Sequence, residues 1–253
     1  GTFLQYRLRS DAQGQVQGEQ VRRFQVASQP EGCVADDRNQ RLFVGEEDAG
    51  VWTLDARAEQ PAELVSVLKV GELLHADVEG LGLYQGAERD YLVISSQGND
   101  SYVVLDAAPP FAPQGAFRVG LNGALGIDGA SETDGLEVTS ANLGGPWSAG
   151  LLVVQDGRKR LPESTQNFKL VPWAEVAKAL ADAVAREYLA EIAGAITEGR
   201  SSQSETLIKQ SEEARAALHA AESALASYVR ALGVHQSLEA QEKVNDQLER
   251  RYK

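Results

Sequence analysis

The chain has 253 residues, 43% of them hydrophobic and 24% charged, which is the composition of an ordinary globular protein. A formal net charge of −13 excludes the basic footprint that nucleic-acid binding requires, and no apolar run reaches the roughly 18 residues that a membrane-spanning helix needs. The single cysteine excludes an internal disulfide bond.

The first residues, Gly1-Thr2-Phe3-Leu4, are typical of a strand and not of a secretory leader, and the chain contains no methionine. We therefore expect a processed or excised segment. Up to about Trp173, short apolar runs recur every ten residues or so between glycine- and aspartate-rich turns, a pattern that indicates an all-β sandwich, barrel or propeller. The predicted strands include residues 3–6, 41–44, 51–54, 81–84, 91–94, 102–105 and 151–154.

A repeated unit favours the propeller among these three architectures. Acidic-glycine turns occur at Glu31-Gly32, Glu79-Gly80 and Asp134-Gly135, and each precedes a strand. Their spacings of about 48 and 55 residues are close to the length of one four-stranded blade. By this measure the region holds three to four blades, whereas complete propellers have four to eight.

After Trp173 the composition changes to alanine, glutamate, glutamine, lysine and leucine, which predicts helices to the end of the chain. A break near residues 199–202 with an N-cap at Ser202 or Ser204, and a second break at Gly233, predict a helical hairpin. A seven-residue repeat of leucines is typical of a coiled-coil seam; it consists of Leu218, Leu225 and Leu232. Either these helices pack on themselves or the seam mediates self-association. The predicted domains are residues 1–180 and 181–253.

Oxygen-bearing side chains stand out among the predicted turns. Asp77 and Glu79 are two residues apart, so in an extended backbone both carboxylates point to one face, an arrangement that a cation stabilises. The run Glu46-Glu47-Asp48 by itself is typical of a solvated loop. Residues 128–135 resemble an EF-hand loop but lack flanking helices, so we reject an EF-hand. Cys33 is expected to be a small buried residue, because no histidine is near it in sequence.

Seven segments in a fixed order resemble the β-propeller phytases. They are EGCVADD (31–37), LFVGEED (42–48), DVEGL (77–81), SSQGN (95–99), SETDG (131–135), VQDG (154–157) and QNFKLVPW (166–173). The resemblance covers about the first 180 residues and does not extend into the helical segment.

The resemblance implies the C-terminal part of a six-bladed β-propeller with calcium ions in its central mouth. It also implies hydrolysis of phosphate monoesters of inositol hexakisphosphate (phytate) by water that calcium activates, with no protein nucleophile. The calcium ligands that it assigns are Glu31, Asp77, Glu79 and Gln97, with Asp128 as a ligand of a separate stabilising calcium. The catalytic residues are Glu31, Asp77, Glu79 and Glu47, and the residues that bind substrate phosphate are Asp134 and Gln97.

Two departures from the family pattern affect these assignments. The segment that should supply further ligands to the stabilising calcium is Arg158-Lys159-Arg160, which would repel a cation, so we expect that site to be lost or altered. The family's earlier blades, which carry the remaining calcium ligands and most phosphate-binding lysines and arginines, do not occur in this sequence. We therefore expect about half a site. From the family we also expect a secreted or periplasmic location.

Two other functions fit parts of the sequence. A calcium-dependent lactonase on a six-bladed propeller would use a similar acidic mouth, but it would not explain the segment 166–173. A non-catalytic, calcium-stabilised propeller fragment could act as a scaffold, with the helix of Leu218, Leu225 and Leu232 as its binding element. The expected partners are phytate and, through the helical segment, another protein or a second copy; nucleic acid and membranes are not expected.

Overall fold

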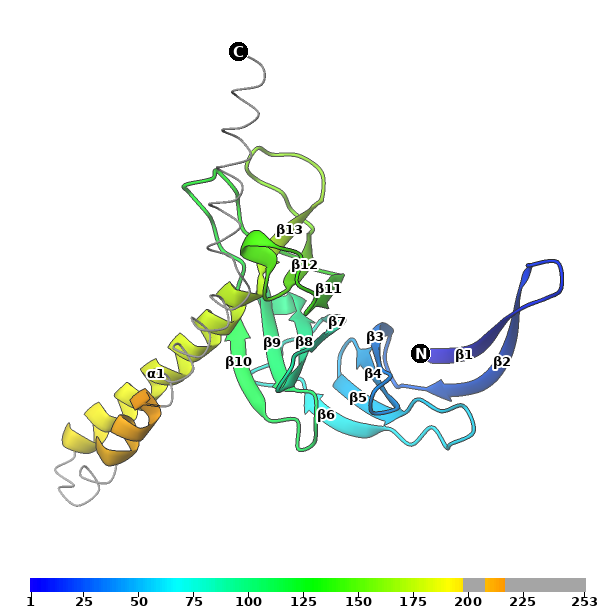
Figure 1. The fold of residues 1–253 in the computed structure, drawn as a ribbon, viewed down its shortest axis with the longest axis horizontal. Coiled ribbons are helices and arrows are strands. Elements are labelled where there is room, and N and C mark those ends of the chain that lie inside the picture. Colours follow the sequence, from blue (N-terminus) through cyan, green and yellow to red (C-terminus); the bar gives the residue numbers. More distant parts are fainter. Residues whose placement is uncertain (198–207, 217–253) are drawn as a thin grey trace, which may run out of the picture. The chain divides into compact units, whose positions relative to one another are not determined.

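The computed structural model describes residues 1–197 and 208–216 of the chain. The chain divides into two compact units, Gly1–Leu180 and Ala181–Lys253. The first unit consists of antiparallel sheets that follow one another along the chain (Figure 1). It begins with a hairpin of β1 (Thr2–Ser10) and β2 (Val16–Gln25).

Three larger sheets follow the hairpin, each with its strands paired in chain order. The first contains β3 (Pro30–Asp36), β4 (Arg41–Glu46), β5 (Gly50–Asp55) and β6 (Val65–Lys69). The second contains β7 (Val78–Gln85), β8 (Asp90–Ser96), β9 (Ser101–Asp106) and β10 (Pro113–Phe117). The third contains β11 (Leu136–Thr139), β12 (Leu151–Asp156) and β13 (Asn167–Pro172). None of the sheets in the described residues closes on itself.

The mainly β prediction is confirmed, and all seven predicted apolar runs lie within strands. One detail of the prediction is wrong. Glu31-Gly32 and Glu79-Gly80 are not turns: they lie near the start of β3 and β7, where the register with the neighbouring strand shifts. Such an irregularity bends a strand without ending it, so glycine and acid residues there give a turn-like sequence.

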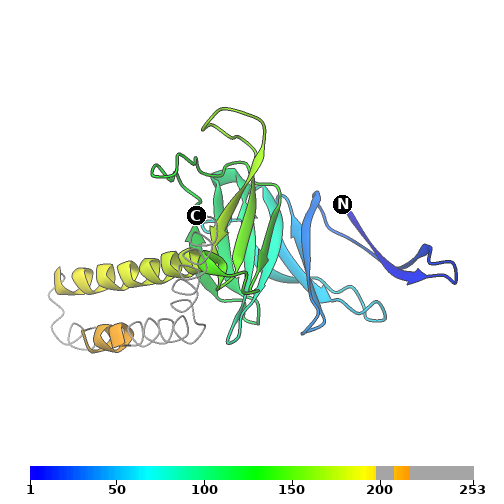
Figure 2. The same cartoon turned by 45° about the horizontal axis from the view of Figure 1, so that its top comes forward.

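Alternating side chains of the second sheet join it to the sheets on both sides. On β8, Leu92 and Ile94 pack with Phe43 of β4 in one core, whereas Val93 packs with Leu152 of β12 in another. All five side chains are fully buried. Because successive residues of a strand point to opposite faces, one strand can serve two cores. The sheets β7–β10 and β11–β13 accordingly lie side by side (Figure 2).

Helix α1 (Trp173–Thr197) follows β13 directly. Its first residues belong to the first unit: the Trp173 ring stacks on Tyr84 with centroids 4.0 Å apart, and Val176 and Leu180 are buried in the second core. Residues 208–216 are also helical, so the prediction of helices after the β region is confirmed in the described residues.

The other helical predictions, namely the caps at Ser202 or Ser204, the break at Gly233 and the seam of Leu218, Leu225 and Leu232, fall outside the residues that the structure describes. None of the described helices is both long enough and apolar enough to cross a membrane.

Candidate functional site

The three acidic-glycine segments are stacked against one another, and the glycines make this possible. A Cβ on Gly32 would lie only 2.6 Å from the Glu79 carbonyl oxygen, and a Cβ on Gly80 only 2.8 Å from the Asp134 carbonyl oxygen. The Gly80 amide donates a hydrogen bond to the same Asp134 oxygen at 2.7 Å. Any larger residue would push β3, β7 and the segment before β11 apart. The acidic residue beside each glycine is thereby brought next to the others.

The carboxylates of these segments interact strongly. Burial, a hydrogen bond with the Glu31 carboxyl, and the charges of Glu31, Asp134 and Asp77 raise the pKa of Glu79 to about 8. Desolvation and the neighbouring Asp77, Asp48 and Glu31 carboxylates raise the pKa of Glu47 as well. A hydrogen bond between two carboxyl groups requires a proton on one of them. We call this group, Glu31, Glu47, Asp77, Glu79 and Asp134, the acidic cluster.

Backbone contacts hold Asp77 in place within the acidic cluster. The Gln97 amide donates to the Asp77 carbonyl oxygen at 2.9 Å, and the Val78 amide donates to the Glu47 carbonyl oxygen at 3.0 Å. A Cβ on Gly98 would lie 1.6 Å from the Ala76 carbonyl oxygen, so only glycine fits where this loop passes. The Gln97 side chain also joins the cluster, because its Nε2 donates to Asp134 Oδ1 at 2.7 Å. Its other amide atom, Oε1, is a hard oxygen ligand of the kind that calcium binds.

A buried hydrogen-bond network supports the loop that carries Asp134, and the sequence did not reveal it. The Thr133 hydroxyl donates to the Gln155 carbonyl oxygen at 2.7 Å and contacts the Tyr102 hydroxyl at 2.6 Å. Gln155 Oε1 accepts a hydrogen bond from the Asp134 backbone amide at 2.8 Å. Burial raises the pKa of Tyr102 to about 12, so its hydroxyl stays protonated. Thr133 and Gln155 lie in segments quoted for the family resemblance, whereas no sequence signal identifies Tyr102.

The run Glu46-Glu47-Asp48 is not a uniform solvated loop. Glu46 is 2% exposed and accepts hydrogen bonds from the Ser28 amide and Trp52 Nε1, each at 2.7 Å. Burial alone would raise the pKa of Glu46, but these hydrogen bonds outweigh it, so the pKa is lowered. Glu46 therefore anchors the loop as a carboxylate, and Glu47 is the member that belongs to the acidic cluster.

The other predicted residues lie elsewhere. Asp128 belongs to a separate buried group, where its Oδ1 accepts a hydrogen bond from Lys169 Nζ at 2.6 Å. The expectation that Cys33 is buried is wrong, because the residue is exposed. Cys33 directly follows the register shift of β3, on the side of the strand that does not face a core.

The acidic cluster fits a bound cation in its chemistry. It offers only carboxylate and amide oxygens, which suit calcium, and a cation would relieve the charge repulsion that contributes to the raised pKa of Glu79. Across the part of the chain that is described, no three histidine, cysteine, aspartate or glutamate side chains converge tightly enough to hold a metal ion by themselves. Calcium binding therefore needs further ligands or a tighter arrangement of these.

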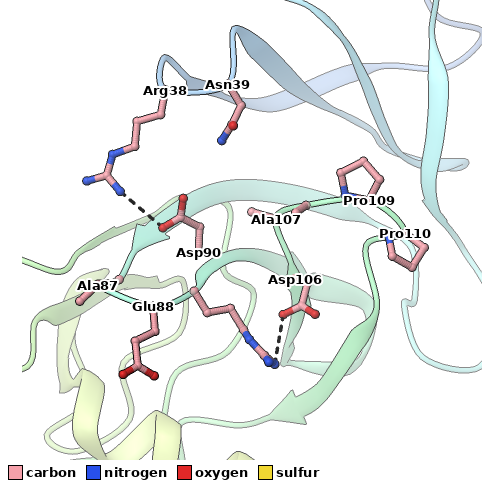
Figure 3. Close-up of a pocket in the computed structure, with 12 residues that line it drawn as sticks. Arg38, Asn39, Ala87, Glu88, Asp90, Asp106, Ala107, Pro109 and Pro110 are labelled. Carbon is pink, nitrogen blue, oxygen red and sulfur yellow. Dashed lines mark ion pairs between the residues drawn. The ribbon is translucent and has the colours of Figure 1, made fainter.

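A cavity of about 420 Å³ at the opposite end of the β7–β8 hairpin offers a different chemistry (Figure 3). It lies roughly 20 Å from the cluster, the length of β7. Arg38 points at Asp90, with Nη1 and Oδ1 3.6 Å apart, and Arg89 Nη1 lies 3.7 Å from Asp106 Oδ1. Because each arginine is paired with an aspartate, this cavity has no net positive charge to attract a phosphate.

Comparison with known proteins shows what the first unit is similar to. A family model described as Phytase matches residues 1–188. Over 190 residues the chain is 36% identical to a 3-phytase of Bacillus subtilis (strain 168), an alignment that covers 72% of this chain and 48% of the relative. The chain thus spans about half the length of the curated relative that it matches.

Proposed function

The chain belongs to the phytase family, and on that premise we propose that it supplies the acidic part of a calcium-dependent phytase site. The proposed reaction is the hydrolysis of phosphate monoesters of inositol hexakisphosphate. The observation that carries the proposal is the stacking of Gly32 and Gly80 on the next acidic segment, which gathers Glu31, Glu79 and Asp134 in one place.

In this proposal Glu31, Asp77, Glu79 and Gln97 hold calcium, with Glu47 beside them. When bound, calcium neutralises phosphate charge and activates the attacking water. The chain's own residues prepare the site for it. Asp77 is fixed through its backbone, and Gln97 Nε2 holds the Asp134 carboxylate by a hydrogen bond. At neutral pH the Glu79 carboxyl retains a proton that a cation displaces. Without a cation, the negative charge of the cluster would repel phytate.

The sheets fit the blades of a propeller, and we propose that they form part of a six-bladed ring whose remaining blades complete the site. The stacking of sheets through alternating cores supports this arrangement. At Gly135, the third glycine of the series, no described atom lies within 4 Å of the Cβ position, so a further segment has room to pack there. Consistent with a relative about twice as long, the missing blades would come from outside residues 1–180. A secreted or periplasmic location, as in the family, is part of the same proposal.

The test measures calcium binding and phosphate release on the same preparations. The variants are Glu31→Gln and Glu79→Gln, with Glu63→Gln as a matched control on an exposed loop away from the cluster. We expect calorimetric calcium binding, and calcium-dependent phosphate release from phytate, to fall at least about 100-fold in both cluster variants and to stay unchanged in the control. Full phosphate release in EDTA, or in either cluster variant, would refute the proposal. Calcium binding with no phosphate release would favour a scaffold, and lactone hydrolysis instead would favour the lactonase.

A further inference from the structure

The chain contains a second oxygen-lined cation position, and a lysine of the chain itself occupies it. Lys169 Nζ donates to Asp128 Oδ1 at 2.6 Å and to Asn167 Oδ1 at 3.1 Å, and it forms an ion pair with Asp156 Oδ2 at 2.9 Å. The side chains of Lys169, Asp128 and Asp156 are 6%, 10% and 0% exposed. Three oxygen atoms therefore surround one buried ammonium group.

Backbone amides balance the rest of the negative charge. The Ser131 and Arg158 amides donate to Asp156 Oδ1 at 3.2 and 3.3 Å. The Arg160 and Leu161 amides donate to Asp128 Oδ2, the latter at 3.1 Å. Asp156 Oδ2 is buried, and the Lys169 ammonium, 2.9 Å away, is its nearest compensating charge. Removing the ammonium would leave this oxygen unpaired in the interior.

The positive charges of the Arg158-Lys159-Arg160 segment do not take part. The Arg158 side chain forms an ion pair with Glu132 at 2.5 Å, and Lys159 Nζ donates to the Pro162 carbonyl oxygen at 2.9 Å. The segment therefore contributes amide donors to the two carboxylates and not ligand oxygens to a cation. A divalent ion in this position would have to compete with Lys169, which already fills it.

We propose that the Lys169 ammonium is a built-in structural cation between Asp128 and Asp156, and that removal of this ammonium opens a calcium site there. Three side-chain oxygens already converge on one point, and calcium takes six to eight oxygens, so water would complete the shell. A divalent ion would neutralise both aspartates, whereas the ammonium neutralises one. The region around Asp128 and Asp156 should therefore stay folded in the presence of a chelator, independently of metal binding at the acidic cluster.

The directions of the pKa shifts agree with the ion pairs that the distances show. Burial lowers the pKa of Lys169, but the hydrogen bonds and charges of Asp128 and Asp156 outweigh it and the pKa is raised. The hydrogen bond from Lys169, together with those from the Arg160 and Leu161 amides, holds the pKa of Asp128 well below its usual range.

The test compares Lys169→Ala with Lys159→Ala, an exposed lysine of the same loop, in thermal melts with EDTA and with calcium. In EDTA we expect the melting temperature of Lys169→Ala to fall by roughly 10 °C, because a buried carboxylate loses its partner. Calcium should restore most of this loss, and calorimetry should find one more bound calcium than in the unsubstituted chain. Lys159→Ala should behave like the unsubstituted chain in both buffers.

A second variant controls for calcium bound elsewhere. The double variant Lys169→Met with Asp156→Asn removes the ammonium together with the carboxylate that depends on it, so we expect it to fold in EDTA and to bind no additional calcium. The proposal is overturned if Lys169→Ala fails to fold in calcium, if calcium gives it no more stabilisation than the unsubstituted chain receives, or if the double variant gains the same extra calcium.

Discussion

The strongest test of the acidic cluster is the neutral substitution Glu79→Gln in the absence of metal. Glu79 has a pKa of 4.5 as a free side chain and of about 8 in the folded chain, so the folded state binds its proton more tightly than the unfolded state. The unfolded state therefore binds fewer protons between these values, and stability falls as the pH rises from 4.5 to 8. Glutamine cannot ionise, so the variant should escape this loss.

The magnitude follows from the same two pKa values. A full shift from 4.5 to about 8 corresponds to nearly 5 kcal/mol at alkaline pH. Because Glu79 is half-buried and solvent screens part of the repulsion, we expect roughly 2 kcal/mol, or about 6 °C in melting temperature. The hydrogen bond with the Glu31 carboxyl can be retained, since the glutamine amide is a donor.

The assay is urea unfolding in EDTA at pH 5 and pH 8, with Glu63→Gln as the exposed control. Glu79→Gln should be more stable than the unsubstituted chain by roughly 2 kcal/mol at pH 8 and by much less at pH 5. In calcium we expect Glu79→Gln to be less stable than the unsubstituted chain, because the variant has lost a charged calcium ligand. If Glu79→Gln is destabilising in EDTA at pH 8, or equal to the control at both pH values, then the carboxylates do not repel one another as described.

Two further substitutions test how the cluster is built. Gly80→Ala should destabilise the fold by about 1–3 kcal/mol in urea unfolding, because its Cβ would lie 2.8 Å from both the Asp134 carbonyl oxygen and the Leu136 amide nitrogen. The matched control, Gly123→Ala, meets no described atom within 4 Å and should change stability by less than about 0.5 kcal/mol; equal effects would exclude close stacking. Thr133→Val should cost about 2 kcal/mol, since it removes a buried hydroxyl that contacts both Tyr102 and Gln155, and Tyr102→Phe should cost about half as much. A Thr133→Val chain as stable as the parent would show that this network is not structural.

Much of the β region could be predicted because its strands are apolar runs bounded by turns. Residues 91–94 and 102–105, for example, fall inside β8 and β9, where alternate side chains serve two cores. The strands that were missed are polar or short: β2 reads VQGEQVRRFQ, and only Phe24 in it is buried. Pairing with β1, not apolar pattern, makes that segment a strand.

The acidic cluster could be predicted in composition but not in geometry. Alternation places Asp77 and Glu79 on one face, yet nothing local in the sequence says that Gly32 packs on Glu79 or that Gly80 packs on Asp134. These contacts join residues about 50 positions apart, so they depend on how the sheets stack. Each glycine is required by the close approach of a neighbouring backbone, which the local sequence does not encode.

At Lys169 the alternation of hydrophobic and polar residues predicts the wrong buried face of the strand. In the segment Asn167–Pro172 an alternation rule would bury Phe168 and Leu170 and expose the lysine between them. The structure does the reverse: Phe168 is 65% and Leu170 56% exposed, whereas Lys169 is 6% exposed. Two buried aspartates that require a cation outweigh hydrophobicity here: Asp156 lies on the paired strand β12, whereas Asp128 is 41 residues away in sequence.

The two groups of carboxylates differ in whether the chain itself supplies a positive charge, and that difference fits the roles proposed for them. Asp128 and Asp156 are paired with Lys169. In the described residues, by contrast, no ion pair involves Glu31, Asp77, Glu79 or Asp134. Carboxylates that only support a fold are stabilised by a permanent internal partner. Carboxylates held together without one, at the cost of a protonated Glu79, are better suited to a cation that arrives from solution and can meet a substrate there.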